Sequence, residues 1–223
     1  MTNLPLSSKL HRYLEYTKLS ATLTYADVDQ MILDAKQHNF VGICVPPFWV
    51  KKVSRDLGDA DVQVVTVIGF PLGYQMTETK IQEMELAIQN GANELDVVMN
   101  LSAFKSKMPW VKIEIAKCAS LAHKHGCLLK IILETAYLTD EEITTACKLC
   151  ADAGADFVKT STGFAAAGAS IHHIQLMRKT LPSNVGIKAS GGIKTAQQAI
   201  DLIEAGADRI GASAALEMIS EKS

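Results

Sequence analysis

The sequence predicts an α/β protein that folds as a single (β/α)8 TIM barrel with a short N-terminal helical extension. Eight short apolar runs alternate with amphipathic helical runs along the 223 residues. Most of the apolar runs lack polar alternation, which is typical of parallel strands buried on both faces. Eight such strand–helix units fit a closed barrel better than an open doubly wound sheet. No linker divides the chain, so residues 1–223 are expected to form one domain.

The predicted strands are short and rich in aliphatic residues. The second is stopped by Pro46-Pro47, because proline cannot continue a central strand. The sixth, FVK, carries a lysine among apolar neighbours. In chain order the strands are expected at residues 14–19, 41–45, 62–70, 94–99, 128–133, 157–159, 185–189 and, very short, 209–210.

Each strand precedes a segment with helical spacing. After the first strand, Val28, Met31, Ile32 and Ala35 lie at i, i+3, i+4 and i+7, which places them on one helix face. Capping boxes are predicted from the spacing of Thr24 with Asp27 and of Thr139 with Glu142. The later helices are expected at about 49–57, 81–88, 111–122, 143–150, 172–181, 196–204 and 214–219.

A faint internal repeat supports a barrel of repeated units. Gly-Ala-Asn or Gly-Ala-Asp begins at Gly91, Gly154 and Gly206, each time between a helix and the next strand. Glycine suits a helix C-terminus that needs positive φ. The repeat indicates architecture and carries no chemistry.

Composition restricts the function classes. The chain is 48% hydrophobic and 21% charged, which is typical of a soluble globular protein. A formal charge of −2 argues against a nucleic-acid or membrane-surface binder. No apolar run has the length and continuity of a signal peptide or membrane span. Five cysteines without regular spacing fit a reducing compartment, so a cytoplasmic location is expected.

Lys159 lies inside the sixth predicted strand, between Val158 and Thr160. Burial disfavours the ammonium form of lysine. That cost is useful if the lysine must act as a neutral amine nucleophile and form a Schiff base. A lysine that snorkels past the strand end, or that pairs with a buried acid, would explain the position equally well.

Other charged residues are expected at the same end of the barrel interior. Asp96 lies on the fourth strand, Lys130 on the fifth and Lys188 on the seventh. A second ammonium from Lys188 would lower the pKa of Lys159, and Asp96 could balance charge and move a proton. A purely structural network is the weaker explanation, because desolvation offsets the attraction of buried ion pairs.

Small residues follow the last three strands. They are Ser161-Thr162-Gly163, Ser190-Gly191-Gly192, and Gly211 with Ser213. The loops after strands seven and eight of such barrels often bind phosphate through backbone N–H groups. Tight turns would also explain the glycines. Together with Lys159, the loops suggest a phosphorylated carbonyl substrate.

Other polar motifs are weaker evidence for a functional site. Cys147 and Cys150 have redox spacing but lie on an apolar helix face, which favours core packing. His123 and His125 are two residues apart on a helix, so their side chains cannot bind the same metal ion. No metal site is expected, because no set of side chains has metal-ligand spacing. Cys44 could line the pocket or react with an aldehyde, although a small buried apolar role explains it as well.

Six motifs are distributed along the chain: ICVPP (43–47), ELDVVMN (94–100), KIILET (130–135), FVKTSTGF (157–164), IKASGGI (187–193) and IGAS (210–213). They resemble the motifs of the deoxyribose-phosphate aldolase family, whose members are class I aldolases. The resemblance covers nearly the whole chain, and FVKTSTGF followed by IKASGGI is its most specific part. It implies that Lys159 forms the Schiff base, that Asp96 and Lys188 transfer protons, and that no cofactor is needed.

The resemblance also implies binding residues. Thr17 and Cys44 match positions that line the sugar pocket. The phosphate site would be formed by Gly163, Gly191, Gly192, Gly211 and Ser213.

Three departures from the family pattern are visible. Glu15-Tyr16-Thr17 replaces a usual Asp-His-Thr, so Glu15 is expected to change the contact with a substrate hydroxyl. Phe164 stands where some members have lysine. The C-terminus EMISEKS lacks the tyrosine with which some members transfer a proton.

The expected activity is reversible cleavage of 2-deoxy-D-ribose 5-phosphate to D-glyceraldehyde 3-phosphate and acetaldehyde. The alternatives are a Schiff-base aldolase for another sugar or keto acid, a pyridoxal-phosphate barrel, and a non-catalytic sugar-phosphate-binding barrel. Small molecules are the expected partners, without nucleic acid or membrane. A homodimer is one candidate assembly, and the sequence does not determine the oligomeric state.

Overall fold

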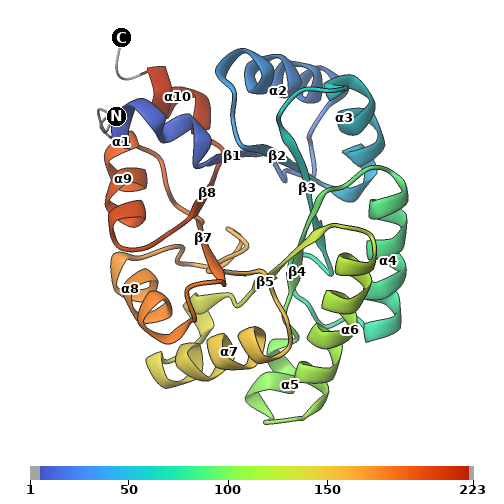
Figure 1. Cartoon of the computed structure of the whole chain (residues 1–223), viewed down its shortest axis with the longest axis vertical. Helices are drawn as coiled ribbons and strands as arrows, with labels where there is room; N and C mark the ends of the chain where they lie inside the picture. Colours follow the sequence, from blue (N-terminus) through green and yellow to red (C-terminus); the bar gives the residue numbers. More distant parts are fainter. Residues whose placement is uncertain (1–5, 221–223) are drawn as a thin grey trace.

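The computed structural model describes residues 6–220, and in these residues eight parallel strands close into a barrel (Figure 1). Each strand pairs with the next in chain order, and β8 pairs with β1. The predicted (β/α)8 fold is therefore confirmed. The strands are β1 Leu14–Thr17, β2 Gly42–Val45, β3 Gln63–Ile68, β4 Glu94–Val98, β5 Leu128–Ile132, β6 Phe157–Lys159, β7 Gly186–Ser190 and β8 Arg209–Ala212.

Helices surround the barrel on its outside (Figure 1). The short N-terminal helix α1 precedes β1, and the final helix α10 packs against β1. The helices are α1 Leu6–Lys9, α2 Tyr25–His38, α3 Val50–Leu57, α4 Thr77–Gln89, α5 Leu101–Lys105, α6 Trp110–Lys124, α7 Asp140–Asp152, α8 Ile171–Thr180, α9 Ala196–Glu204 and α10 Ala215–Ser220. Three 3-10 turns, η1 Leu10–Arg12, η2 Pro47–Trp49 and η3 Thr135–Tyr137, complete the elements.

The helix caps and the glycine conformations that the sequence predicts are present in the structure. Thr24 and Thr139 cap α2 and α7 in complete capping boxes. The three repeat glycines, Gly91, Gly154 and Gly206, have φ of 99°, 90° and 118°. Each therefore occupies a conformation that other residues rarely adopt.

Several predictions about elements need correction. β1 and β3 end at Thr17 and Ile68, each two residues before the predicted end. The eighth strand continues beyond Ile210 to Ala212, because Gly211 pairs with both Glu15 and Ser190. Helix α5 was not expected, since five residues are too few to show a helical period. Asn100 caps it by accepting a hydrogen bond from the N–H of Ala103.

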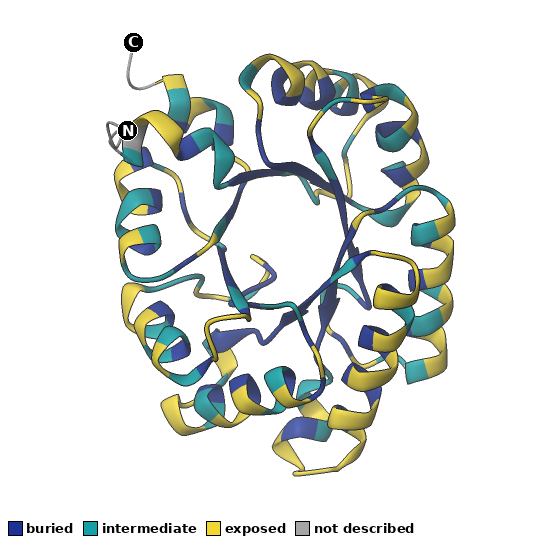
Figure 2. Cartoon of the chain, in the orientation of Figure 1, coloured by how far each residue is buried: buried dark blue, intermediate teal, exposed yellow. Residues whose placement is uncertain are grey.

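The core is divided by the strands into two parts. The large part lies between barrel and helices, and the helices bury their inner faces there while exposing the outer ones (Figure 2). A small apolar cluster of Cys44, Val65 and Val67 is separate from it. Because side chains alternate along a strand, the positions between the outer-core residues point into the barrel. Several of these positions are charged, so the barrel interior holds buried charged side chains.

Candidate active site

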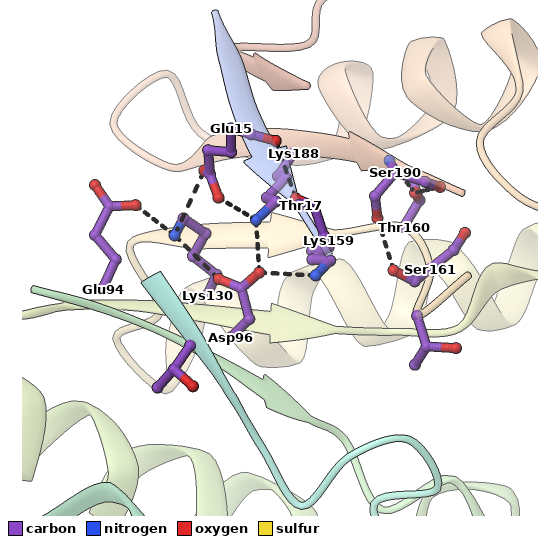
Figure 3. Close-up of polar contacts among 12 residues, drawn as sticks. Glu15, Thr17, Glu94, Asp96, Lys130, Lys159, Thr160, Ser161, Lys188 and Ser190 are labelled. Atoms are coloured by element: carbon purple, nitrogen blue, oxygen red, sulfur yellow. Dashed lines mark hydrogen bonds and ion pairs between the residues drawn. The ribbon is translucent and has the colours of Figure 1, made fainter. Parts of the chain in front are cut away.

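Three lysines and three acids meet inside the barrel (Figure 3). They come from β1, β4, β5, β6 and β7, and each is at most 2% exposed. We call this the interior charge cluster. Its members are Glu15, Glu94, Asp96, Lys130, Lys159 and Lys188.

Asp96 is the centre of the cluster. Its Oδ2 accepts hydrogen bonds from Lys159 Nζ at 2.7 Å and from Lys188 Nζ at 2.6 Å. Its Oδ1 accepts from Lys130 Nζ at 3.0 Å. Burial alone would raise the pKa of Asp96, but the three ammonium groups hold it well below its usual range. Asp96 is therefore a carboxylate at neutral pH.

The two lysines beside Asp96 differ in charge. Lys159 and Lys188 are paired in register on neighbouring strands. Burial lowers the pKa of Lys159, Asp96 opposes this, and the Lys188 charge lowers it again. For Lys188, Asp96 and Glu15 outweigh burial and raise the pKa. Lys188 therefore remains an ammonium ion, while Lys159 is the lysine biased toward the amine.

Glu15 belongs to this cluster and is absent from the cavity wall, so its expected effect on a substrate hydroxyl stays a prediction. It is 1% exposed, its Oε2 accepts a hydrogen bond from Lys188, and its Oε1 lies 3.6 Å from Lys130 Nζ. The nearby Lys130 and Lys188 charges overcome burial and lower the pKa of Glu15. Its carboxylate is thus engaged by two lysines of the protein.

A cavity of about 270 Å³ opens above the cluster, at the carboxyl ends of the strands. Lys159 is the one cluster member in its wall. The wall also contains Thr17, Gly163, Gly191, Gly192, Gly211 and Ser213, which are all the predicted binding residues except Cys44. The wall is completed by Lys194, Ser20 and Leu19, which no sequence motif indicated, together with Thr162, Phe164, Ser190, Ile193 and Ala212.

The loops around the cavity are held in place by buried polar contacts. Glu134 accepts hydrogen bonds from the N–H and the hydroxyl of Thr162. Ser190 Oγ donates to the carbonyl of Ser161 at 2.6 Å, and the N–H of Ala169 donates to the carbonyl of Ser190 at 3.0 Å. The β6–α8 loop is therefore tied at both ends, next to Lys159.

Glycine is required where the loops meet. Gly163, Gly191 and Gly192 have φ of 88°, 86° and 75°. At Gly168 a Cβ atom would lie 2.0 Å from the carbonyl oxygen of Gly191. Without side chains, the backbone N–H groups of these loops can approach an anion closely.

Cys44 lies deeper than predicted. It is fully buried beside Val65 and Val67 and is absent from the cavity wall. Burial raises the pKa of its thiol, despite the opposing charge of Lys188. Phe164, in contrast, is 62% exposed at the cavity rim, and its ring meets Phe70 edge to face at 5.3 Å.

Other surface grooves carry none of the predicted residues. Two grooves of about 610 Å³ lie outside the barrel, one along α4 and α6 and one between α5, α6 and α7. Within residues 6–220, no group of three or more His, Cys, Asp or Glu side chains is placed to hold a metal ion. In the same range, no helix is long and apolar enough to cross a membrane.

Comparison with known proteins agrees with this geometry. A family model described as DeoC/LacD family aldolase matches residues 10–220. The deoxyribose-phosphate aldolase of Enterococcus faecalis is 48% identical over 213 residues, which cover 95% of this chain and 96% of the relative. That of Aciduliprofundum boonei is 45% identical over 212 residues, covering 95% and 96%.

Solved structures agree as well. The tetrameric deoxyribose phosphate aldolase from Aeropyrum pernix superposes with a TM-score of 0.90 at 32% identity, over 96% of this chain and 91% of that one. A structure described as QR15, an aldolase, gives 0.90 at 39% identity, over 95% of both chains. The chain belongs to the DeoC/LacD aldolase family.

Proposed function

We propose that the protein cleaves 2-deoxy-D-ribose 5-phosphate reversibly to D-glyceraldehyde 3-phosphate and acetaldehyde, through a Schiff base on Lys159. The observation that carries the proposal is the position of Lys159. It is the cluster lysine whose pKa is lowered, and it reaches a cavity bordered by glycine-rich loops. The close relatives named deoxyribose-phosphate aldolase support the choice of sugar.

The reaction begins at the Lys159 amine. Its lone pair attacks the C1 aldehyde, and loss of water gives an iminium ion. Removal of the proton from the C3 hydroxyl breaks the C2–C3 bond and releases glyceraldehyde 3-phosphate. The electron pair of that bond moves into the iminium and gives an enamine. Protonation at C2 and hydrolysis then release acetaldehyde and restore the amine.

Asp96 is proposed to transfer protons to and from Lys159, and Lys188 to control the charges of Asp96 and Lys159. Asp96 contacts both lysines through one oxygen, so it can accept a proton from Lys159 and return it, directly or through water. Lys188 keeps Asp96 ionised and disfavours a second ammonium on Lys159. Both residues therefore act on the charge of the reacting nitrogen.

The phosphate is proposed to bind at the opposite wall of the cavity. The backbone N–H groups near Gly163, Gly191, Gly192 and Ser213 would hold its oxygens, and Gly211 would leave space beside Lys188. Lys194 would supply a positive charge. Thr17, in the cavity wall, would border the sugar, and Cys44 would shape the pocket from beneath.

Borohydride reduction tests the chemistry. With 2-deoxy-D-ribose 5-phosphate present, reduction is expected to leave a stable adduct on the peptide that contains Lys159. Lys159→Met should give no adduct and no turnover. An adduct on another lysine, or none while a control aldolase is labelled, would reject the mechanism. Preference for another sugar in a panel would reject the substrate.

The same proposal includes a single domain, a cytoplasmic location and a homodimer. All five cysteines are unpaired and buried, which suits a reducing compartment. Light scattering coupled to gel filtration tests the assembly, and a mass of about twice 24.1 kDa is expected.

A further inference from the structure

The interior charge cluster extends toward the amino end of the barrel through one more cation. Arg209 is the first residue of β8, and its side chain is 19% exposed. Its Nη2 lies 3.6 Å from Oε1 of Glu94. The other oxygen of Glu94 lies 2.5 Å from Lys130 Nζ, and Lys130 in turn donates to Asp96. A continuous series of ion pairs thus connects Arg209 to the partner of Lys159.

The charged groups of this series balance one another when Lys159 is left out. Three carboxylates, Glu15, Glu94 and Asp96, face three cations, Lys130, Lys188 and Arg209. Lys159 is the seventh group. The buried assembly is neutral when Lys159 is an amine and carries a net positive charge when Lys159 is protonated. Unbalanced buried charge is costly, so the balance favours the amine.

Arg209 decides this balance. Without it, three carboxylates would face two cations, and protonation of Lys159 would restore neutrality. We propose that Arg209, acting through Glu94 and Lys130, is a positioning residue that sets the charge state of Lys159 from the opposite end of the barrel. The proposal rests on the proposed function for its catalytic meaning.

The charged groups around Lys159 and around Arg209 support an effect that passes through Glu94 and Lys130. Lys159 faces Asp96 on β4, Lys188 on β7 and the protonated thiol of Cys44 on β2, and shares its cavity with Lys194. Glu15 and Lys130 lie one contact further away.

Near Arg209, the guanidinium carbon lies 5.9 Å from the centre of the Phe157 ring, and Lys188 is its register partner. Asp208, the preceding acid, is engaged by Arg178 and by the N–H of Ile187. Glu94 is therefore the carboxylate that carries the effect of Arg209.

Competitive labelling measures the charge of Lys159 without substrate. Trace acetylation with acetic anhydride follows the free amine, and peptide mass spectrometry reports the pH of half-maximal labelling at Lys159. In Arg209→Met this midpoint should rise by about half a pH unit or more, since an unscreened negative charge favours the ammonium. In Glu94→Gln it should fall by a similar amount.

Opposite shifts from two partners of one ion pair are the decisive readout, because loosened packing would not reverse sign between them. The double variant should return to the wild-type midpoint, and Arg209→Lys should retain it. Arg55→Met removes an equal charge from the outside of α3, where Arg55 is 67% exposed, and should shift nothing.

Coincident midpoints in wild type, Arg209→Met and Glu94→Gln would overturn the proposal, as would shifts in one direction. Borohydride trapping with the sugar phosphate is run on the same proteins. Failure of trapping in the wild type would reject the proposed function and leave the labelling result to decide the role of Arg209.

Discussion

Lys159 and Lys188 show how the same residue type takes two roles on neighbouring strands. Lys188 has two carboxylate partners, Asp96 and Glu15, whereas Lys159 has only a share of Asp96. The difference in partners gives the two lysines pKa shifts of opposite direction. The proposed roles of Lys159 as nucleophile and of Lys188 as permanent cation thus follow from the number of acids within reach of each.

Replacement of Lys188 by Met should therefore impair the nucleophile. Lys159 would lose the neighbouring positive charge and gain sole use of Asp96 Oδ2, so its pKa would rise. The amine is the reactive form, so the acid limb of kcat/KM should move to higher pH. At pH 7 the loss should be about a hundredfold or more. A pH–rate profile measures both effects, and an unshifted acid limb would contradict the assigned role of Lys188.

Single residues were predictable where a charge interrupts an apolar strand. Asp96, Lys159 and Lys188 could be identified in this way and lie together. Glu15 could not be placed, because its partners are on β5 and β7 and no local signal records a contact across the barrel. The contacts of Glu94 with Lys130 and Arg209 could not be predicted for the same reason.

At the scale of elements, start signals were the most reliable. The predicted bounds of β6 and α9 are exact, since Asp156 and Thr160 border β6 and Thr195 caps the start of α9. The bounds of β8 were wrong because Gly211 and Ala212 resemble a loop in composition, and only pairing with β1 and β7 makes them a strand. Strand ends that depend on neighbours cannot be predicted from local composition.

The capping box of α7 gives a test at this scale. Thr139→Ala removes the hydroxyl that accepts from the N–H of Glu142. We expect a decrease of about 1 kcal/mol in the free energy of unfolding, measured with urea. Thr145→Ala, on the exposed face of the same helix, is the control and should change stability by less than about half as much. An equal decrease in the free energy of unfolding for both variants would show that the capping hydrogen bond does not stabilise the helix.

The contact between the β6–α8 and β7–α9 loops gives a second test. Gly168→Ala would place a methyl group against the backbone of Gly191, so one loop must move away from the other. Because both loops border the proposed phosphate site, KM for the phosphorylated sugar should rise at least about tenfold, and kcat should change less. Ala166→Ser, exposed on the same loop, should leave both constants unchanged. A fall in kcat alone would argue against phosphate positioning.

The whole molecule protects its thiols. Cys44, Cys118, Cys127, Cys147 and Cys150 are all buried and unpaired, and burial raises the pKa of each. A thiol reagent should therefore find essentially no reactive cysteine in the native protein and five after denaturation. Labelling rates against urea, followed by mass spectrometry, check this. Rapid labelling of one cysteine at neutral pH in the native state would contradict the prediction.

Closure of the sheet by β1 and β8 also constrains how the chain can fold while it is being synthesised. β1 and β8 are the first and last strands of the barrel in chain order, yet they pair side by side in the closed sheet. Until β8 emerges, Glu94 lacks Arg209, and one edge of β1 has no partner to pair with. A nascent chain that ends after β7 would expose two open strand edges and an incomplete set of charges. β8 therefore completes both the hydrogen-bonded ring and the charge balance inside it, because Arg209 lies on the strand that closes the sheet.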